Sequence, residues 1–287
     1  MVIDNFNTTV LYLVWLPYGI DHFKAFIESY CSYNASCSHQ LVIVFNGLTV
    51  EHRNKPEEYI SYLEDRQVKA HQYLYFENGQ DINIYQRAAK DIQTKHILFL
   101  NTYSRILADD WLKHYVDNFD DHTGVISASG SWQSYYSSVY QKHPVKWEQA
   151  KGFLYNFRKY KLFIKAFFYW RFLFKPFPNP HIRTNAFMVK VRDFLEMKTA
   201  AVNTKFGAYQ FENGRRSLTD FYMAKGLKVL VVDKYGKIFQ PSEWKKSSTF
   251  WIDNQENLLV SDNQTRIYET ATAEEKKQMG WLAWGTK

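Results

Sequence analysis

The 287-residue sequence has little cysteine and no long apolar run. Its two cysteines, Cys31 and Cys37, have no second pair with which to form a metal site or a disulfide framework, so we expect a reducing compartment. No window approaches the roughly 18 continuous apolar residues of a membrane-spanning helix. The apolar run at residues 10–16 follows Asp4 and no basic residue, which predicts a first strand rather than a signal sequence. These absences indicate a soluble or peripheral protein.

Several cofactor and catalytic signatures are also missing. No GxGxxG follows the first predicted strand, and the chain contains no Walker loop, no HExxH and no GxSxG. The sequence therefore has none of the motifs typical of dinucleotide-binding enzymes, P-loop nucleotidases, zinc proteases or α/β-hydrolases.

The overall composition is that of a folded, basic protein. Apolar residues make up 46% and charged residues 23%, which excludes the low hydrophobicity and high charge of a disordered chain. The net charge of +7 suits an anionic partner such as a nucleotide, a nucleic acid or a phospholipid surface.

Much of this positive charge lies in residues 146–178. Between residues 146 and 175, eight basic residues stand against one acid, Glu148, among twelve aromatic residues. A basic, aromatic helical stretch is typical of an interfacial membrane helix, so we predict a membrane-docking insertion. The alternative is a helical pair packed on a sheet with its lysines in solvent. Nucleic acid is the third option, but the sequence has no recognition-module signature, so none is expected as a partner.

Apolar runs alternate with helical patterns along the chain. This alternation predicts an α/β fold with a mostly parallel sheet flanked by helices, whose ligands collect at the carboxyl ends of the strands. Strands are expected at residues 10–16, 41–45, 73–76, 96–100, 181–190, 228–233 and 257–260. Helices are expected at residues 21–30, 56–68, 81–93, 111–119, 192–197, 211–226 and after the capping box at Thr272.

The segment HILFLNTYSRILADDWLKHYV at residues 96–116 resembles the part of GT-A glycosyltransferases, especially family 2, in which a strand ends in the Asp-x-Asp motif. LVIVFNG at residues 41–47 precedes this segment, and HIRTNAFMV, FENGRRSLT and GLKVLVVD follow it, in the order of that family, so the resemblance covers most of the chain. Together these segments resemble a subgroup of bacterial glycosyltransferases that lacks Asp-x-Asp. The resemblance implies a single GT-A-like catalytic domain over residues 1–287, although a shared fold does not establish chemistry.

In this family the Asp-x-Asp carboxylates hold a divalent cation, Mg or Mn, on the donor diphosphate. Here the turn reads Asn101, Thr102, Tyr103, Ser104 and has no carboxylate, so no metal ligand is predicted. Asn101, Tyr103 and Ser104 could still bind ribose or phosphate. The cations that could stabilise the leaving group in place of a metal are Arg105, Arg183, Arg215 and Arg216. Alternatively, Asn101 only satisfies turn backbone and the arginines are solvated.

An inverting transfer needs a carboxylate that accepts the acceptor's proton. The resemblance implies Glu212 as this base, and we expect it at a helix amino terminus, where its competing role is to complement the helix dipole. Asp220 is the reserve candidate.

The remaining assignments follow from the resemblance, and each has a plain structural alternative as turn, cap or core residue. Pro17, Tyr18, Asn46 and Asp81 would contact the nucleotide. An acceptor pocket would be lined by Trp132, His181 and Asn185, because sugars dock on aromatic faces and amides.

The resulting hypothesis is a hexosyltransferase-like enzyme that moves sugar from a nucleotide-sugar to a glycan or lipid-linked acceptor. It would be inverting and metal-independent, and it would act in cell-surface polysaccharide synthesis at the cytoplasmic face of a bacterial membrane. The rival is a non-catalytic membrane- or glycan-binding relative with a degenerate site, which the loss of both aspartates favours.

Overall fold

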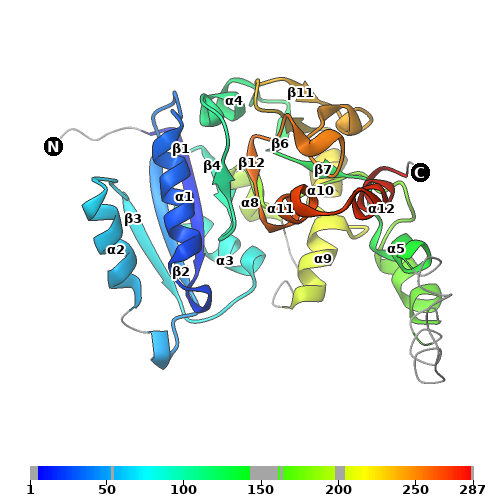
Figure 1. The fold of residues 1–287 in the computed structure, drawn as a ribbon, viewed down its shortest axis with the longest axis horizontal. Helices are drawn as coiled ribbons and strands as arrows, with labels where there is room; N and C mark the ends of the chain where they lie inside the picture. Colours follow the sequence, from blue (N-terminus) through cyan, green and yellow to red (C-terminus); the bar gives the residue numbers. More distant parts are fainter. Residues whose placement is uncertain (1–5, 53–54, 143–160, 162–163, 198–203, 286–287) are drawn as a thin grey trace.

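The computed structural model describes residues 6–52, 55–142, 161, 164–197 and 204–285. An eight-stranded sheet runs through these residues in the order β11-β10-β6-β9-β4-β1-β2-β3 (Figure 1). Its strands are β1 (Thr8–Trp15), β2 (Gln40–Asn46), β3 (Gln72–Phe76), β4 (His96–Leu100), β6 (Thr123–Ser127), β9 (Ala186–Lys190), β10 (Lys228–Val232) and β11 (Ile238–Phe239). Strands β1 to β4 pair in parallel, as do β6 and β10, whereas β9 is antiparallel to both β4 and β6.

Two small antiparallel sheets lie beyond the carboxyl ends of the central strands. In one, β5 (Arg105–Ile106), which follows β4, pairs with β12 (Val260–Ser261). In the other, β7 (Gly130–Ser131), which follows β6, pairs with β8 (His181–Ile182). Both therefore tie chain-distant loops to the edge of the sheet where ligands of parallel sheets bind.

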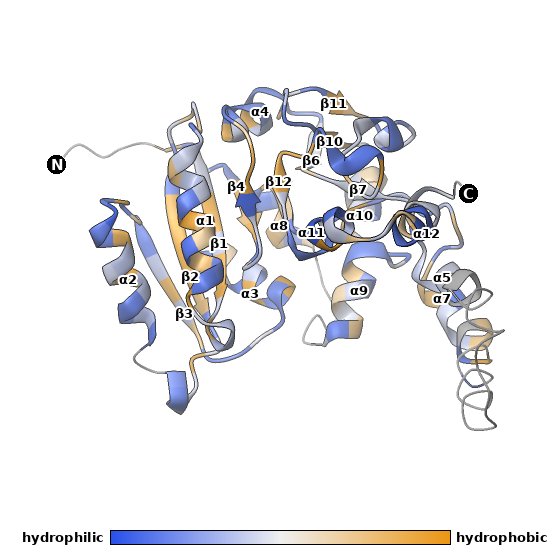
Figure 2. Ribbon diagram, in the orientation of Figure 1, coloured by the Kyte–Doolittle hydropathy of each residue, from blue (hydrophilic) through white to orange (hydrophobic). Residues whose placement is uncertain are grey.

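Buried apolar side chains alternate between the two faces of the sheet. In β1, Leu11 and Leu13 join one core cluster, while Val10, Tyr12 and Val14 join the other. This period of two is the geometry of a strand that is covered on both faces. Figure 2 shows the central strands as the most apolar part of the ribbon.

Helices cover both faces, and each contributes an apolar side to one cluster. One face carries α1 (Asp21–Ser32), α2 (Lys55–Asp65) and α4 (Trp111–Asp117). The other carries α3 (Asp81–Ala88), α8 (Val191–Glu196), α9 (Lys205–Asn213), α10 (Leu218–Ala224), α11 (Asn263–Thr270) and α12 (Ala273–Trp284). The predicted α/β architecture, a mostly parallel sheet flanked by helices, is confirmed.

Two predicted elements are divided in the structure. The strand expected at residues 181–190 splits into β8 and β9 because its first residues pair with β7 rather than with the central sheet. The helix expected at residues 211–226 is the end of α9 followed by α10. Gly214 is the C-cap of α9, where a Cβ would meet the Gln210 carbonyl oxygen at 2.4 Å, and the Ser217 side chain caps α10.

The basic aromatic segment is described only in part, because residues 146–160 and 162–163 lie outside the described residues. It follows α5 (Tyr135–Lys142) and includes a π-helical turn (Ala166–Trp170) and α7 (Arg171–Leu173). Trp170 and Phe174 are buried in a small cluster against α5. None of the described helices is both long and apolar enough to span a membrane.

Candidate functional site

Two adjoining cavities lie at the carboxyl edge of the sheet. The larger has a volume of about 480 Å³ and the smaller about 220 Å³. Gln80, Asp81 and Asn101 line both, so the two cavities meet between the start of α3 and the turn after β4. This edge is where the parallel strands predict a ligand.

The smaller cavity has aromatic walls. It is lined by Trp15, Tyr18, Thr102 and Tyr103 besides the shared residues and Gly79. The Tyr18 and Tyr103 ring centroids are 5.5 Å apart, and 51% of Tyr18 is exposed. Thr102 fixes this wall because its Oγ1 donates to the Leu13 carbonyl and accepts from the Trp15 N–H. A flat, aromatic and open pocket of this kind suits a nucleobase and its ribose.

Asp81 is the first residue of α3 and is open to both cavities. Surrounding protein desolvates its carboxylate, which raises the pKa of Asp81 above the usual aspartate value. The N-cap of α3 is Gln80, so Asp81 does not cap the helix but stands in its first turn, where a carboxylate complements the helix dipole.

The Asn101 side chain stabilises the turn after β4 through its oxygen and leaves its nitrogen without a hydrogen bond to the turn. Its Oδ1 accepts the Tyr103 N–H at 3.0 Å and the Ser104 hydroxyl at 3.2 Å, which closes the turn after β4. Its Nδ2 makes no hydrogen bond with the described residues and belongs to the side chain that lines both cavities. The position thus offers an N–H donor to a ligand in either cavity.

A divalent cation does not fit this turn. Hard cations need oxygen ligands, and the only side-chain oxygen of Asn101 is already used by the turn. Within the described residues, no group of three or more His, Cys, Asp or Glu side chains could hold a metal ion.

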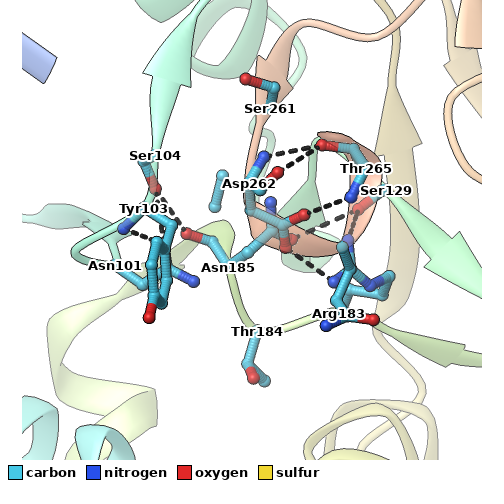
Figure 3. A network of polar contacts seen from close by, with 12 residues as sticks. Asn101, Tyr103, Ser104, Ser129, Arg183, Thr184, Asn185, Ser261, Asp262 and Thr265 are labelled. Atoms are coloured by element: carbon cyan, nitrogen blue, oxygen red, sulfur yellow. Dashed lines mark hydrogen bonds and ion pairs between the residues drawn. The ribbon is translucent and has the colours of Figure 1, made fainter. Parts of the chain in front are cut away.

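Arg183 is committed to a buried ion pair. Its Nη2 donates to Asp262 Oδ2 at 2.6 Å, and its guanidinium carbon lies 4.1 Å from the Phe250 ring centroid. Asp262 is 1% exposed and also caps α11 through the Thr265 N–H. Figure 3 shows this pair beside Asn185 and the turn that carries Asn101. The ion pair therefore fixes the β8–β9 turn against α11.

Glu212 projects into the larger cavity from the last turn of α9. The expectation that it begins a helix was wrong, because α9 starts at Lys205. Its Oε2 accepts both the Thr184 N–H, at 3.0 Å, and the Thr184 hydroxyl, at 2.6 Å. These donors offset the unfavourable carboxyl end of the helix dipole, and Oε1 makes no hydrogen bond with the described residues.

His181 lines the same cavity and is uncharged at neutral pH. Burial desolvates the ring and lowers the pKa of His181 below 6.5, although the nearby Glu212 carboxylate opposes this shift. His181 Nδ1 lies 2.8 Å from the Asn179 carbonyl, which can only accept, so Nδ1 carries the proton. Nε2 is then left as a hydrogen-bond acceptor.

Other nucleotide-site candidates lie outside the two cavities. Asn46 is fully buried, and its Nδ2 donates to the Gly79 carbonyl, so it shapes the loop before α3. Pro17 is exposed beside the smaller cavity without lining it. Ser104 is buried in the turn, and Arg105 lies in β5.

Of the remaining candidates, all but Asn185 lie outside the larger cavity. Trp132 donates from its indole to the Pro241 carbonyl and does not line the larger cavity. Asp220 lies in the first turn of α10, where it accepts from Ser217 and pairs with Lys175. Arg215 and Arg216 are exposed and line neither cavity. Asn185 does line the larger cavity and accepts from Ser129 at 3.3 Å.

Sequence reasoning missed several residues that form the larger cavity. Thr184 and Asp262 are the partners of Glu212 and Arg183, and their long-range pairing leaves no local sequence signal. Tyr135 and Tyr209 supply aromatic wall. Tyr209 could have been found from its three-residue spacing to Glu212, had the Thr204 cap been read as the start of a helix.

Comparisons with known proteins complete this description. The sequence matches no protein-family model and no curated protein. Solved structures that align with it include the galactosyltransferase LgtC with donor and acceptor sugar analogues (TM-score 0.44, 7% identity, 78% of this chain and 73% of that chain). Mouse xyloside xylosyltransferase 1 aligns with TM-score 0.38 and 10% identity over 77% of this chain and 81% of that chain.

A third structure is the mannosyltransferase PcManGT from Pyrobaculum calidifontis in complex with GDP-Man and Mn2+ (TM-score 0.35, 12% identity, 43% of this chain). This chain covers 35% of that mannosyltransferase and 21% of S. aureus TarS. At these scores and identities the comparisons assign neither a family nor a substrate to the chain.

Proposed function

We propose that this protein is a glycosyltransferase that moves a sugar from a nucleotide-sugar donor to a hydroxyl of a glycan or lipid-linked acceptor. The reaction transfers a hexose and inverts the configuration at its anomeric carbon. It serves cell-surface polysaccharide synthesis at the cytoplasmic membrane face. The nucleotide occupies the smaller cavity, and the donor sugar and the acceptor occupy the larger one.

The observation that carries this proposal is the Glu212 carboxylate at the larger cavity. One oxygen is fixed by two donors from Thr184 and the other makes no hydrogen bond with the described residues. A carboxylate held in one orientation with a free oxygen is what a general base requires. The aromatic pocket beside it, lined by Tyr18 and Tyr103, supports the nucleotide assignment.

In the proposed reaction the acceptor oxygen attacks the anomeric carbon as the bond from that carbon to the diphosphate oxygen breaks. Glu212 Oε1 takes the proton from the attacking hydroxyl, and the nucleoside diphosphate leaves with the bonding electron pair. Thr184 keeps Glu212 oriented throughout.

Charge on the departing diphosphate is met by N–H donors rather than by a cation held at the turn. Asn101 Nδ2 is available at the junction of the two cavities. Arg183 also lines the larger cavity, although the ion pair that it forms with Asp262 carries no net charge. Fixed dipoles of this kind stabilise developing charge without reorganising during the reaction.

A matched pair of variants tests the proposal. Glu212→Gln keeps the side-chain size and removes the base, so release of nucleoside diphosphate from the donor should fall by about 10²–10⁴-fold. Donor affinity, measured by titration calorimetry, should stay unchanged. Asp220→Asn, in a carboxylate outside the cavity, should leave turnover near that of the unmodified protein. Equal turnover in Glu212→Gln would contradict the proposal, and a wild type that binds no nucleotide-sugar would favour the non-catalytic binder.

Membrane docking by the segment at residues 146–178 is the second part of the proposal. Among its described residues, five large apolar side chains are 45–64% exposed: Ile164, Phe167, Phe168, Tyr169 and Phe172. The Arg171 guanidinium lies 4.9 Å and 4.6 Å from the Phe167 and Phe172 ring centroids. Exposed rings with cations among them suit an anionic lipid surface.

A further inference from the structure

One face of α9 forms a wall of the larger cavity. Lys205, Ala208, Tyr209 and Glu212 all line it, at spacings of three, four and seven residues. Residues with these spacings share one side of a helix, and positions three apart lie about one turn from each other. The Tyr209 ring therefore lies on the same wall as the Glu212 carboxylate, about one helical turn away.

The Tyr209 ring is the outermost member of an aromatic stack. It lies on Tyr135 with ring centroids 5.2 Å apart and planes 28° from parallel, and 36% of the residue is exposed. Tyr135 in turn packs against Trp170 and Phe174, each with its ring centroid 4.9 Å away. Because the stack supports the Tyr209 ring, the ring is held in place while its exposed part lines the cavity.

Three hydrogen-bond acceptors without a partner among the described residues belong to side chains that line the same cavity as this ring. Glu212 Oε1 and His181 Nε2 both belong to side chains that line the cavity, and each lacks a partner among the described residues. Asn213 also lines the cavity, is 8% exposed, and has no partner for its buried Oδ1. Three neighbouring acceptors are complementary to a ligand that donates several hydrogen bonds.

We propose that Tyr209, supported by Tyr135, is the platform on which the pyranose ring of the acceptor stacks, with its hydroxyls donating to Glu212, His181 and Asn213. This inference rests on the proposed function and names the acceptor site within it. The electron-rich face of an aromatic ring attracts the polarised C–H bonds on one face of a sugar, and the acceptors take its hydroxyl protons. The stacked sugar then holds a hydroxyl one helical turn away, at the base.

Saturation-transfer NMR tests the site with simple methyl pyranosides as probes. Methyl glucosides, galactosides, mannosides and N-acetylglucosaminides, each as both anomers, are titrated into the full chain without nucleotide. At least one should bind the wild type. Tyr209→Ala should weaken its binding at least tenfold, whereas Tyr209→Phe, which keeps the ring, should retain it. Tyr235→Ala changes a tyrosine that is 71% exposed and lines neither cavity, and should have no effect.

The outcomes separate this inference from the function on which it rests. Binding that survives Tyr209→Ala, or the absence of binding by any probe to the wild type, overturns the acceptor platform. If nucleotide-sugars still bind and turn over in that case, the glycosyltransferase proposal stands. The thermal unfolding midpoint of each variant, compared with that of Tyr209→Phe, shows whether a loss of binding is a loss of fold.

Discussion

At the residue scale, the proposed function depends on Asn101 for its interaction with the charge of the donor diphosphate. A carboxamide can close the turn with its oxygen and still present an N–H to the cavities, whereas a carboxylate can offer only acceptors. The same position therefore favours a phosphate when it is Asn and a cation when it is Asp.

Asn101→Asp should keep the fold, because one carboxylate oxygen can still accept from Tyr103 and Ser104. The other oxygen would face the donor diphosphate. Affinity for nucleoside diphosphate in EDTA should fall about tenfold or more, since 1.4 kcal/mol of repulsion corresponds to a factor of ten. Titration calorimetry at fixed ionic strength measures this change. Unchanged or tighter binding in EDTA would show that Asn101 does not face the phosphates.

His96 makes stability depend on pH. Burial in β4 lowers the pKa of His96 to about 4, from 6.5 when unfolded, so the unfolded chain binds more protons between these values. The stabilisation is present above pH 6.5 and is lost as the pH falls toward 4. From pH 7 to pH 5 this group alone should remove about 2 kcal/mol from the free energy of unfolding.

Urea unfolding of His96→Phe at the same two pH values isolates this contribution. The variant fills a similar volume without a titrating group. Between pH 7 and pH 5, the loss in its free energy of unfolding should therefore be smaller than the loss in the wild type by about 2 kcal/mol. Parallel losses in the two proteins would contradict the pKa assigned to His96.

At the element scale, the β8–β9 turn is joined to α11 by the Arg183–Asp262 pair. Arg183→Ala leaves a buried carboxylate without its cation and should destabilise the protein by about 3–5 kcal/mol. Asp262→Asn removes the charge while keeping an oxygen for the cap, so the double variant should recover part of this loss. A double-mutant cycle in urea measures the coupling, and additive losses would contradict it.

The basic aromatic segment at residues 146–178 should bind anionic membranes. Co-sedimentation with vesicles of phosphatidylglycerol and phosphatidylcholine should exceed that with phosphatidylcholine alone, and should weaken as salt is added. Phe168→Glu with Phe172→Glu should reduce binding at least tenfold. Ile267→Glu, at a residue in α11 that is 52% exposed, is the matched control. Equal binding to neutral and anionic vesicles would contradict electrostatic docking.

Elements with long apolar runs could be predicted from sequence, whereas elements set by distant pairing could not. The strands at β1, β2 and β4 follow directly from continuous apolar residues. The break between β8 and β9 arises because two residues pair with β7, about 50 residues earlier in the chain. The periodicity of apolar residues does not indicate which distant strand a segment pairs with. The placement of Glu212 failed for a local reason, because α9 begins after the Thr204 cap and ends at Gly214, before the Ser217 cap of α10.

At the scale of the whole molecule, the sheet order gathers residues from distant parts of the chain at one edge. Tyr18 follows β1, Asn101 follows β4, and Thr184 precedes β9. Glu212 lies in the last turn of α9. The sequence predicted that polar candidates gather at this edge, and Glu212 does line a cavity there, while its role as a base stays a prediction. It could not predict which polar residues face the cavities, since Asn46 and Ser104 have suitable side chains that line neither cavity and that the fold uses for its own hydrogen bonds.

The most direct test of the central claim is a thermal unfolding titration of the intact chain with UDP-, GDP-, CMP- and dTDP-sugars, each with manganese and with EDTA. A ligand that binds only the native state raises stability, by about 2.7 kcal/mol at 100 times its dissociation constant. We predict that one nucleotide class raises the unfolding midpoint to the same extent in both conditions. No shift with any nucleotide-sugar would contradict the glycosyltransferase assignment, and a shift that requires manganese would contradict the metal-free site at Asn101.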